Sequence, residues 1–310
     1  MIHAIWDATD VFRDRLGELA WGALALGIVC HVLRLLAVSR AWRNIIKGAY
    51  PQARVRWRSI VAAVFAGVGV NAIIPARGGD AVRVVLAKRS VEASSYATIA
   101  STLVLLSLFD FVVATCLVIW AAVTGQLPKV LGPSFDFSWA FHNPGTFLKV
   151  VAVVVAVALV LVLWFAEQIG DFRRRLTQGF AILRDRRAYF RFVALWQGVD
   201  WTLRFVGVLF FLRAFGLPVT MHNALLVQVS AGLASLLPIS PSGIGTEQAF
   251  LLYLLRNQAS RTALLAFSVG MRITLIAVNM ALGFGALFIT LRTVHWREHG
   301  ATTSTDPDTR

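Results

Sequence analysis

Long runs of apolar residues set the strongest limit on what this chain can fold into. Residues 22–36 and 150–165 are almost free of charged side chains, and residues 97–123 and 263–291 carry one charged residue each. A transmembrane helix needs about 20 consecutive and predominantly apolar residues. The whole chain is 57% hydrophobic, whereas a soluble globular domain is about 45–50% apolar. The sequence therefore predicts an all-α polytopic membrane protein.

The apolar runs define a single integral membrane domain over residues 1–299 with about six spanning helices. Residues 300–310 are polar, and we expect them to form a disordered tail. Spanning helices are expected, among others, at about residues 16–38, 96–123, 147–166, 192–215 and 263–291.

Two shorter apolar segments end at helix-breaking residues. The first, residues 59–74, is too short for an easy crossing at a rise of about 1.5 Å per residue. A chain that turned back there would return the following cations, Lys88 and Arg89, to the side from which it entered. Residues 222–237 stop in a similar way. We interpret both segments as re-entrant helical hairpins, with breaks at Pro75, Gly78 and Gly79 in the first and at Pro238, Pro241, Gly243 and Gly245 in the second.

The net charge of +14 is concentrated between the predicted spans, which argues against a nucleic-acid partner. Residues 39–58 carry cations and no acidic residue, and residues 167–191 carry a second basic cluster. Short cytoplasmic loops of membrane proteins show this basic excess. We therefore expect both segments in the cytoplasm and the N-terminus outside. Residues 39–58 also interleave aromatic side chains with cations, which is typical of an interfacial amphipathic segment.

With this orientation, the chain divides into two halves of opposite topology, at about residues 16–123 and 192–291. Each half contains a span, an interrupted hairpin and a second span, and the halves are joined by span 147–166 and cytoplasmic segment 167–191. In transporters built from inverted repeats, the paired broken segments point to the substrate site. The two breaks share a local pattern, Ile73-Ile74-Pro75 and Leu236-Leu237-Pro238.

Four charged residues lie inside predicted spans: Asp110, Asp200, Arg204 and Arg272. Each costs at least about 2.5–3.5 kcal/mol at a helix centre, so such a residue is a functional candidate by default. Structural roles stay open as well. Asp200 and Arg204 are spaced to pair on their own helix, and Asp110 and Arg272 have opposite charges that suit an interhelical ion pair.

The two interrupted segments read NAIIPARGGDAVRVVLAKR from residue 71 and LPISPSGIGTEQAFLLYLL from residue 237. They resemble the family of the lysylphosphatidylglycerol synthase/flippase transmembrane region. The resemblance implies a flippase-like fold with two re-entrant segments in a bacterial or archaeal plasma membrane. Larger family members add a soluble aminoacyltransferase domain, so the resemblance favours translocation over synthesis here. The matching residues are Asn71, Pro75, Arg77, Gly79, Asp80 and Arg83 in the early motif and Pro238, Gly243, Gly245 and Glu247 in the late one.

The hypothesis that joins these features is a transporter for an anionic phospholipid or a lipid-linked headgroup. Half-helix N-termini and arginine forks both suit a phosphate group. A membrane-embedded transferase or an accessory subunit that acts on a polyprenyl-phosphate or a phospholipid is the alternative. Membrane lipids are the expected partners, a homo-oligomer stays open, and neither a cofactor nor a metal is expected. The candidate substrate-binding residues are Asn71, Arg77, Asp80, Arg83, Asp110, Arg204, Glu247, Arg272 and Asn279.

Overall fold

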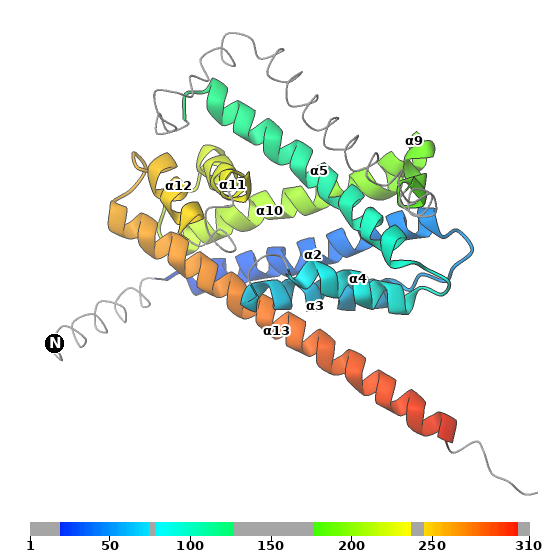
Figure 1. Ribbon diagram of the computed structural model, residues 1–310. Coiled ribbons are helices and arrows are strands. Elements are labelled where there is room, and N and C mark those ends of the chain that lie inside the picture. The colour runs from blue at the N-terminus through cyan, green and yellow to red at the C-terminus, as the bar shows by residue number, and fades with distance from the viewer. Residues whose placement is uncertain (1–18, 75–77, 127–176, 237–244, 303–310) are drawn as a thin grey trace, which may run out of the picture.

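The computed structural model describes residues 19–74, 78–126, 177–236 and 245–302. These residues form helices and no strand (Figure 1), which confirms the predicted all-α class. Within them, three segments are long and apolar enough to cross a membrane: Trp21–Ala49, Tyr96–Ala121 and Arg261–Phe288. The expected span at residues 147–166 lies outside the described residues.

Two groups of helices follow one another along the chain. The first consists of α2 (Trp21–Ala49), α3 (Trp57–Ile73), α4 (Gly78–Ser90) and α5 (Tyr96–Val123). Short helical turns, η1 (Ala181–Arg184), α9 (Arg186–Tyr189) and the π-helix η2 (Phe190–Ala194), precede the second group. That group consists of α10 (Leu195–Ala214), α11 (Met221–Leu236), α12 (Thr246–Leu254) and α13 (Arg261–Thr302). Helix α13 continues past residue 300, where the sequence predicts that a disordered tail begins.

Helices α2 and α10 pack against each other in antiparallel directions along their whole length (Figure 1). At one end, the backbone N–H of Ala20 donates to the carbonyl of Ala214 at 3.1 Å. At the other end, the Asn44 amide donates to the carbonyl of Phe192 at 2.7 Å. Small residues allow close approach between these ends, because a Cβ added at Gly27 would lie 3.3 Å from the Phe211 ring. This pair forms the axis of the molecule.

Helices α3 and α4 form an antiparallel helical hairpin. The backbone N–H of Gly79 donates to Asn71 Oδ1 at 2.7 Å, which joins the end of α3 to the start of α4. One turn further from the tip, a Cβ at Gly67 would lie 2.8 Å from the carbonyl oxygen of Gly79. The predicted hairpin geometry is therefore present, whereas its position in a membrane stays a prediction. Residues 75–77, which include the expected break at Pro75 and the candidate site residue Arg77, lie outside the described residues.

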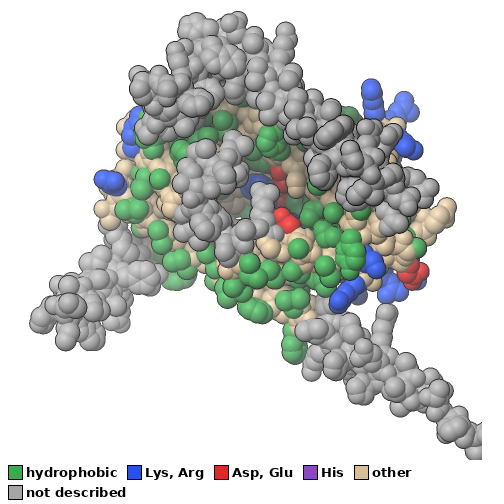
Figure 2. Space-filling view, in the orientation of Figure 1, with side chains coloured by type: hydrophobic (Ala, Val, Ile, Leu, Met, Phe, Trp, Pro, Cys, Tyr) green, Lys and Arg blue, Asp and Glu red, His purple; other side chains and the backbone are tan. Residues whose placement is uncertain are grey.

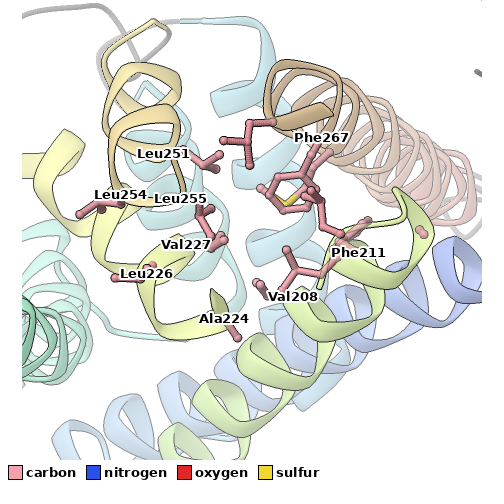
Figure 3. Packing of buried hydrophobic residues seen from close by; sticks show 14 of the residues in the cluster. Val208, Phe211, Ala224, Leu226, Val227, Leu251, Leu254, Leu255 and Phe267 are labelled. Atoms are coloured by element: carbon pink, nitrogen blue, oxygen red, sulfur yellow. The ribbon is translucent and has the colours of Figure 1, made fainter. Parts of the chain in front are cut away.

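Helices α11 and α12 pack together in the second half. Val227 of α11 and Leu251 of α12 are almost fully buried, and they share a core cluster with Phe211 of α10 and Phe267 of α13 (Figure 3). Gly245 is the N-cap residue before α12 and has a φ of +88°, a left-handed conformation that favours glycine. The predicted breaks at Pro238, Pro241 and Gly243 lie outside the described residues.

The contacts between helices come in matched pairs. Helix α3 crosses α13, where a Cβ at Gly283 would lie 2.5 Å from the Cα of Gly69. The corresponding helix of the second group, α11, packs on α5, with Gly232 facing Ala114 and Val118. Helix α4 packs on α5, and α12 packs on α13 in the same way. Such a correspondence is what two related halves would produce, and the division into two halves stays a prediction.

Most described cations gather at one end of the molecule. Gln178 donates to the carbonyl of Ala49 at 2.9 Å, and the backbone N–H of Ser95 donates to the Tyr50 hydroxyl at 3.0 Å. The end of α2, the turn before α5 and the short turns before α10 therefore lie together. The cations of this basic end are Arg40, Arg43, Lys47, Arg54, Arg56, Arg58, Lys88, Arg89, Arg184, Arg186, Arg187 and Arg191.

Residues 39–58 differ from their sequence pattern, which predicts an interfacial amphipathic segment. Helix α2 continues to Ala49, and Trp42, Ile45 and Ile46 are fully buried. Trp42 also donates to the Thr102 hydroxyl of α5 at 3.0 Å. The aromatic and aliphatic side chains at this end of α2 therefore belong to the protein core. A pattern of aromatic residues between cations fits a protein core and a lipid interface equally well.

The α3–α13 crossing generates a stability prediction. Gly283→Leu places a side chain against the backbone of Gly69, which cannot move aside, and we expect a loss of about 1–3 kcal/mol through overpacking. Gly285→Leu is the matched control on the same helix, because a Cβ there meets no atom within 4 Å. Thermal unfolding of the detergent-solubilised protein measures both, and equal melting temperatures would contradict the close crossing.

The hairpin of α3 and α4 generates a topology prediction. In a background that lacks Cys30 and Cys116, Arg58→Cys and Arg89→Cys should react with an impermeant thiol reagent from the same side of the membrane. Asn257→Cys, which lies just beyond the end of α12, should react from the opposite side. All three positions are exposed. Labelling of positions 58 and 89 from opposite sides would show that α3 and α4 cross the membrane.

Candidate functional site

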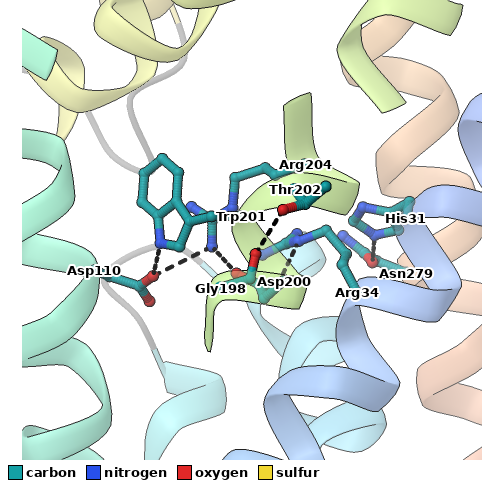
Figure 4. Close-up of polar contacts among 9 residues, drawn as sticks. All are labelled: His31, Arg34, Asp110, Gly198, Asp200, Trp201, Thr202, Arg204 and Asn279. Atoms are coloured by element: carbon teal, nitrogen blue, oxygen red, sulfur yellow. Dashed lines mark hydrogen bonds and ion pairs between the residues drawn. The ribbon is translucent and has the colours of Figure 1, made fainter. Parts of the chain in front are cut away.

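A line of polar contacts crosses the helices at the centre of the molecule (Figure 4). On α2, His31 Nε2 lies 2.8 Å from Asn279 Oδ1 of α13. One turn further along α2, Arg34 Nε donates to Asp200 Oδ1 of α10 at 3.0 Å. The line therefore connects α13, α2 and α10, and it continues to α5 through Arg204.

Asp200 is the centre of this line. Its side chain has 0% exposed area and accepts from both Arg34 and Arg204, each at 3.0 Å. The Asp200–Arg204 pair has the i, i+4 spacing that the sequence predicts. A buried carboxylate is tolerated only when it is paired and hydrogen-bonded. The two arginines meet that requirement and join α2 to α10.

Asp110 of α5 is held more loosely. Its Oδ1 accepts from Trp201 Nε1 at 2.9 Å and lies 3.5 Å from Arg204 Nη2, and its side chain is 37% exposed. The guanidinium of Arg204 stacks over the Trp201 ring at 4.4 Å from the ring centroid. Arg204 Nε is buried and has no hydrogen-bond acceptor in the described part of the chain. The Trp201 ring therefore orients Arg204, and the Nε–H of Arg204 is a donor that no acceptor in the described residues uses.

A second ion pair joins the α11–α12 unit to α13. Arg272 Nη1 donates to Glu247 Oε2 at 3.1 Å, and both side chains are at least two-thirds buried. Glu247 lies in the first turn of α12, two residues after the N-cap Gly245. The sequence suggested a pair between Asp110 and Arg272, but Arg272 binds Glu247 while Asp110 binds Arg204 and Trp201. Their helices suit this arrangement because α13 packs on α12 and α5 lies beside α10.

The ion pairs around Asp200 and the Arg272–Glu247 pair both border one cavity of about 200 Å³, which lies between α2, α10, α11, α12 and α13. His31, Arg34, Arg204 and Glu247 line it, together with Gln228 of α11. Figure 2 shows acidic and basic side chains together in the middle of a largely apolar face. The remaining lining is mostly apolar and includes Val208, Phe211, Val227, Met271 and Leu275.

The early-motif residues have roles in the first hairpin. Asn71 joins its two helices, and Asp80 pairs with Arg83 of the same helix at 3.3 Å. Gly79 packs against the backbone of Gly67, where a Cβ would not fit. These contacts place Asn71, Gly79, Asp80 and Arg83 at the hairpin tip, and none of these four residues lines the central cavity.

Three central residues are absent from the predicted set of site residues: His31, Arg34 and Asp200. Asp200 was visible as an intramembrane charge, but only as a partner of Arg204. Arg34 lies inside the apolar run of residues 22–36, one turn after His31. A charge within a spanning helix indicates function by default, so this signal was present in the sequence.

The site can bind an anion by charge and hydrogen bonding. Arginine presents a planar fork of donors that matches the oxygens of a phosphate, and two arginines border the cavity. In the described ranges, no group of three or more His, Cys, Asp or Glu side chains is arranged to hold a metal ion.

Fold and site together define a multi-pass helical membrane protein with a charged cavity between its helices. The chain belongs to the family described as the lysylphosphatidylglycerol synthase TM region, whose family model matches residues 3–283. This match confirms the family that the two motifs suggest. No curated protein and no solved structure matches the chain.

The central ion pairs generate a stability prediction. Asp200→Asn leaves Arg34 and Arg204 without their shared carboxylate, so we expect the free energy of unfolding to fall by about 3–5 kcal/mol. Asp80→Asn breaks a single pair in which the carboxylate is 34% exposed, and such pairs contribute about 0–1 kcal/mol. Reversible unfolding in mixed micelles measures both variants. Similar losses for the two would contradict the central role of Asp200.

Proposed function

We propose that this protein is a flippase-like transporter that moves a lipid with an anionic phosphate headgroup between the two leaflets of a bacterial or archaeal plasma membrane. The observation that carries the proposal is the cavity, where Arg34 and Arg204 lie side by side among helices whose outer surfaces are apolar. A charged pocket at this depth suits a polar headgroup, whereas acyl chains remain in the surrounding bilayer.

Charge and geometry both favour a phosphate as the group that is bound. Each arginine already contacts the Asp200 carboxylate, which supports its suitability for an oxyanion. Arg204 retains a buried Nε–H for a further acceptor. The mostly apolar lining lowers the local dielectric, which strengthens electrostatic contacts inside the cavity.

The arrangement of the helices suits alternating access to this cavity. In transporters with inverted repeats, one half rocks against the other around a site near the bilayer midplane. Here the two halves meet at the α2–α10 pair, and Arg34 and Arg204 lie on those two helices. The interrupted segments would then act as re-entrant elements on opposite sides of the site.

Orientation follows from the cations. The basic end carries the long list of arginines and lysines given above, whereas Arg213, Arg256 and Arg261 lie at the opposite end, where α2 begins and α10 ends. The positive-inside rule assigns the basic end to the cytoplasm. Segments 39–58 and 167–191 are accordingly proposed to face the cytoplasm.

Lipid movement in reconstituted vesicles tests the proposal. The purified full chain is incorporated into vesicles of phosphatidylcholine that contain a fluorescent phosphatidylglycerol, and an impermeant quencher reports which leaflet holds the label. Arg204→Lys keeps the charge but loses the fork, and a charge-assisted hydrogen bond contributes about 1.5–3 kcal/mol. We therefore expect translocation to slow by about tenfold or more.

Arg213→Lys is the matched control, because Arg213 lies on the same helix but is exposed at its far end. It should translocate the label at the rate of the unaltered protein. Chromatography of the recovered lipid shows whether the headgroup is chemically unchanged, which separates transport from a transferase reaction. Equal rates in vesicles with and without the protein would refute the proposal.

A further inference from the structure

The three acids around the cavity differ in how firmly they are paired. Asp200 is fully buried and has two arginine contacts at 3.0 Å, and Glu247 is 18% exposed with Arg272 at 3.1 Å. Asp110 is 37% exposed, and its arginine contact is the longest, at 3.5 Å to Arg204. Loss of charge from Asp110 therefore removes the least stabilisation among the three acids.

Arg204 connects Asp110 to the proposed substrate. The same Nη2 atom contacts Asp110 and Asp200, and the side chain also lines the cavity. A phosphate that binds there competes with Asp110 for one guanidinium group. Asp200 does not compete in the same way, because Arg34 holds it from the other side.

The charges of the group give the direction of this competition. Arg34 and Arg204 supply two positive charges, and Asp110 and Asp200 supply two negative charges, so the group is neutral when both acids are ionised. A lipid phosphodiester adds one negative charge to this group. A proton on Asp110 restores neutrality and releases Arg204 to the phosphate.

We propose that Asp110 is the proton-binding residue of the transporter, and that the protein binds an anionic phosphate headgroup together with one proton. This inference rests on the proposed lipid transport and names its coupling ion. The proton is taken up by the Asp110 carboxylate when the headgroup binds and is released when the headgroup leaves. No covalent bond to the lipid forms or breaks.

The other charged groups near Asp110 do not replace it in this role. Helix α10 presents Asp200 and Arg204, and α2 presents Arg34 and His31, which contacts Asn279. Helix α11 carries His222, whose ring makes an edge-to-face contact with Trp120 near the far end of α5. On α4, Asp80 and Arg83 pair with each other, and Lys88 and Arg89 lie at the basic end. Glu247 also lines the cavity, but Arg272 pairs with it at 3.1 Å. His31 lines the cavity without an acidic partner among the described residues, so it is tested separately.

Equilibrium binding across pH tests the proposal. Short-chain dihexanoyl phosphatidylglycerol is titrated into the full chain in a neutral detergent between about pH 5 and about pH 8, and coupled uptake of one proton predicts affinity that rises by up to about tenfold per unit as pH falls. Asp110→Asn should bind at high pH as tightly as the unaltered protein does at low pH, with no dependence on pH. His31→Gln and the exposed control Glu92→Gln should keep the pH dependence.

A second measurement counts the protons directly. Titrations of the unaltered protein in buffers of different ionisation enthalpy give the number of protons taken up with each lipid, which should reach about one near the middle of this pH range. Binding without pH dependence, proton uptake that persists in Asp110→Asn, or its loss in His31→Gln alone would overturn the role of Asp110 and leave the transport proposal intact. Absence of binding at every pH would overturn both.

Discussion

The pairing of the buried Asp200 with two arginines is the interaction on which the rest of the structure depends. Its carboxylate has no exposed surface, and it accepts from Arg34 of α2 and Arg204 of α10. An uncompensated charge at this position would be strongly destabilising. The two antiparallel helices must therefore keep the register that brings these groups together, and every other helix packs on this pair or on its immediate neighbours.

Small residues and charges have complementary roles around that axis. Glycines let the helices approach closely at the α3–α13 crossing and within the α3–α4 hairpin. Without a hydrophobic driving force between helices in lipid, such close packing and polar contacts hold a bundle together. One member of each ion pair around this axis, Arg34, Arg204 or Glu247, also lines the cavity. The same arginines can therefore serve the fold and the proposed headgroup, provided that a ligand or a proton compensates for any contact that is exchanged.

Much of the fold was predictable because hydropathy, chain breaks and loop charge are properties of short segments. The apolar runs gave the class and the approximate spans, and the proline and glycine breaks gave the first hairpin, whose helices do pack in antiparallel directions. Segment 39–58 was assigned to the membrane interface, but Trp42 and its neighbours lie in the core. Alternating aromatic and basic residues fit either setting, and only the packing of α5 and η1 on α2 decides between them.

The sequence by itself determined that this is a helical membrane protein of the lysylphosphatidylglycerol synthase TM region family, with charges inside its spans and two interrupted segments. Only the tertiary structure decided which charges meet. Asp110 binds Arg204 and Trp201, Glu247 binds Arg272, and Arg34 enters the centre from a run that reads as almost uncharged. Partners of this kind depend on the rotation and register of helices that are far apart in the chain, and hydropathy along one helix carries no information on either.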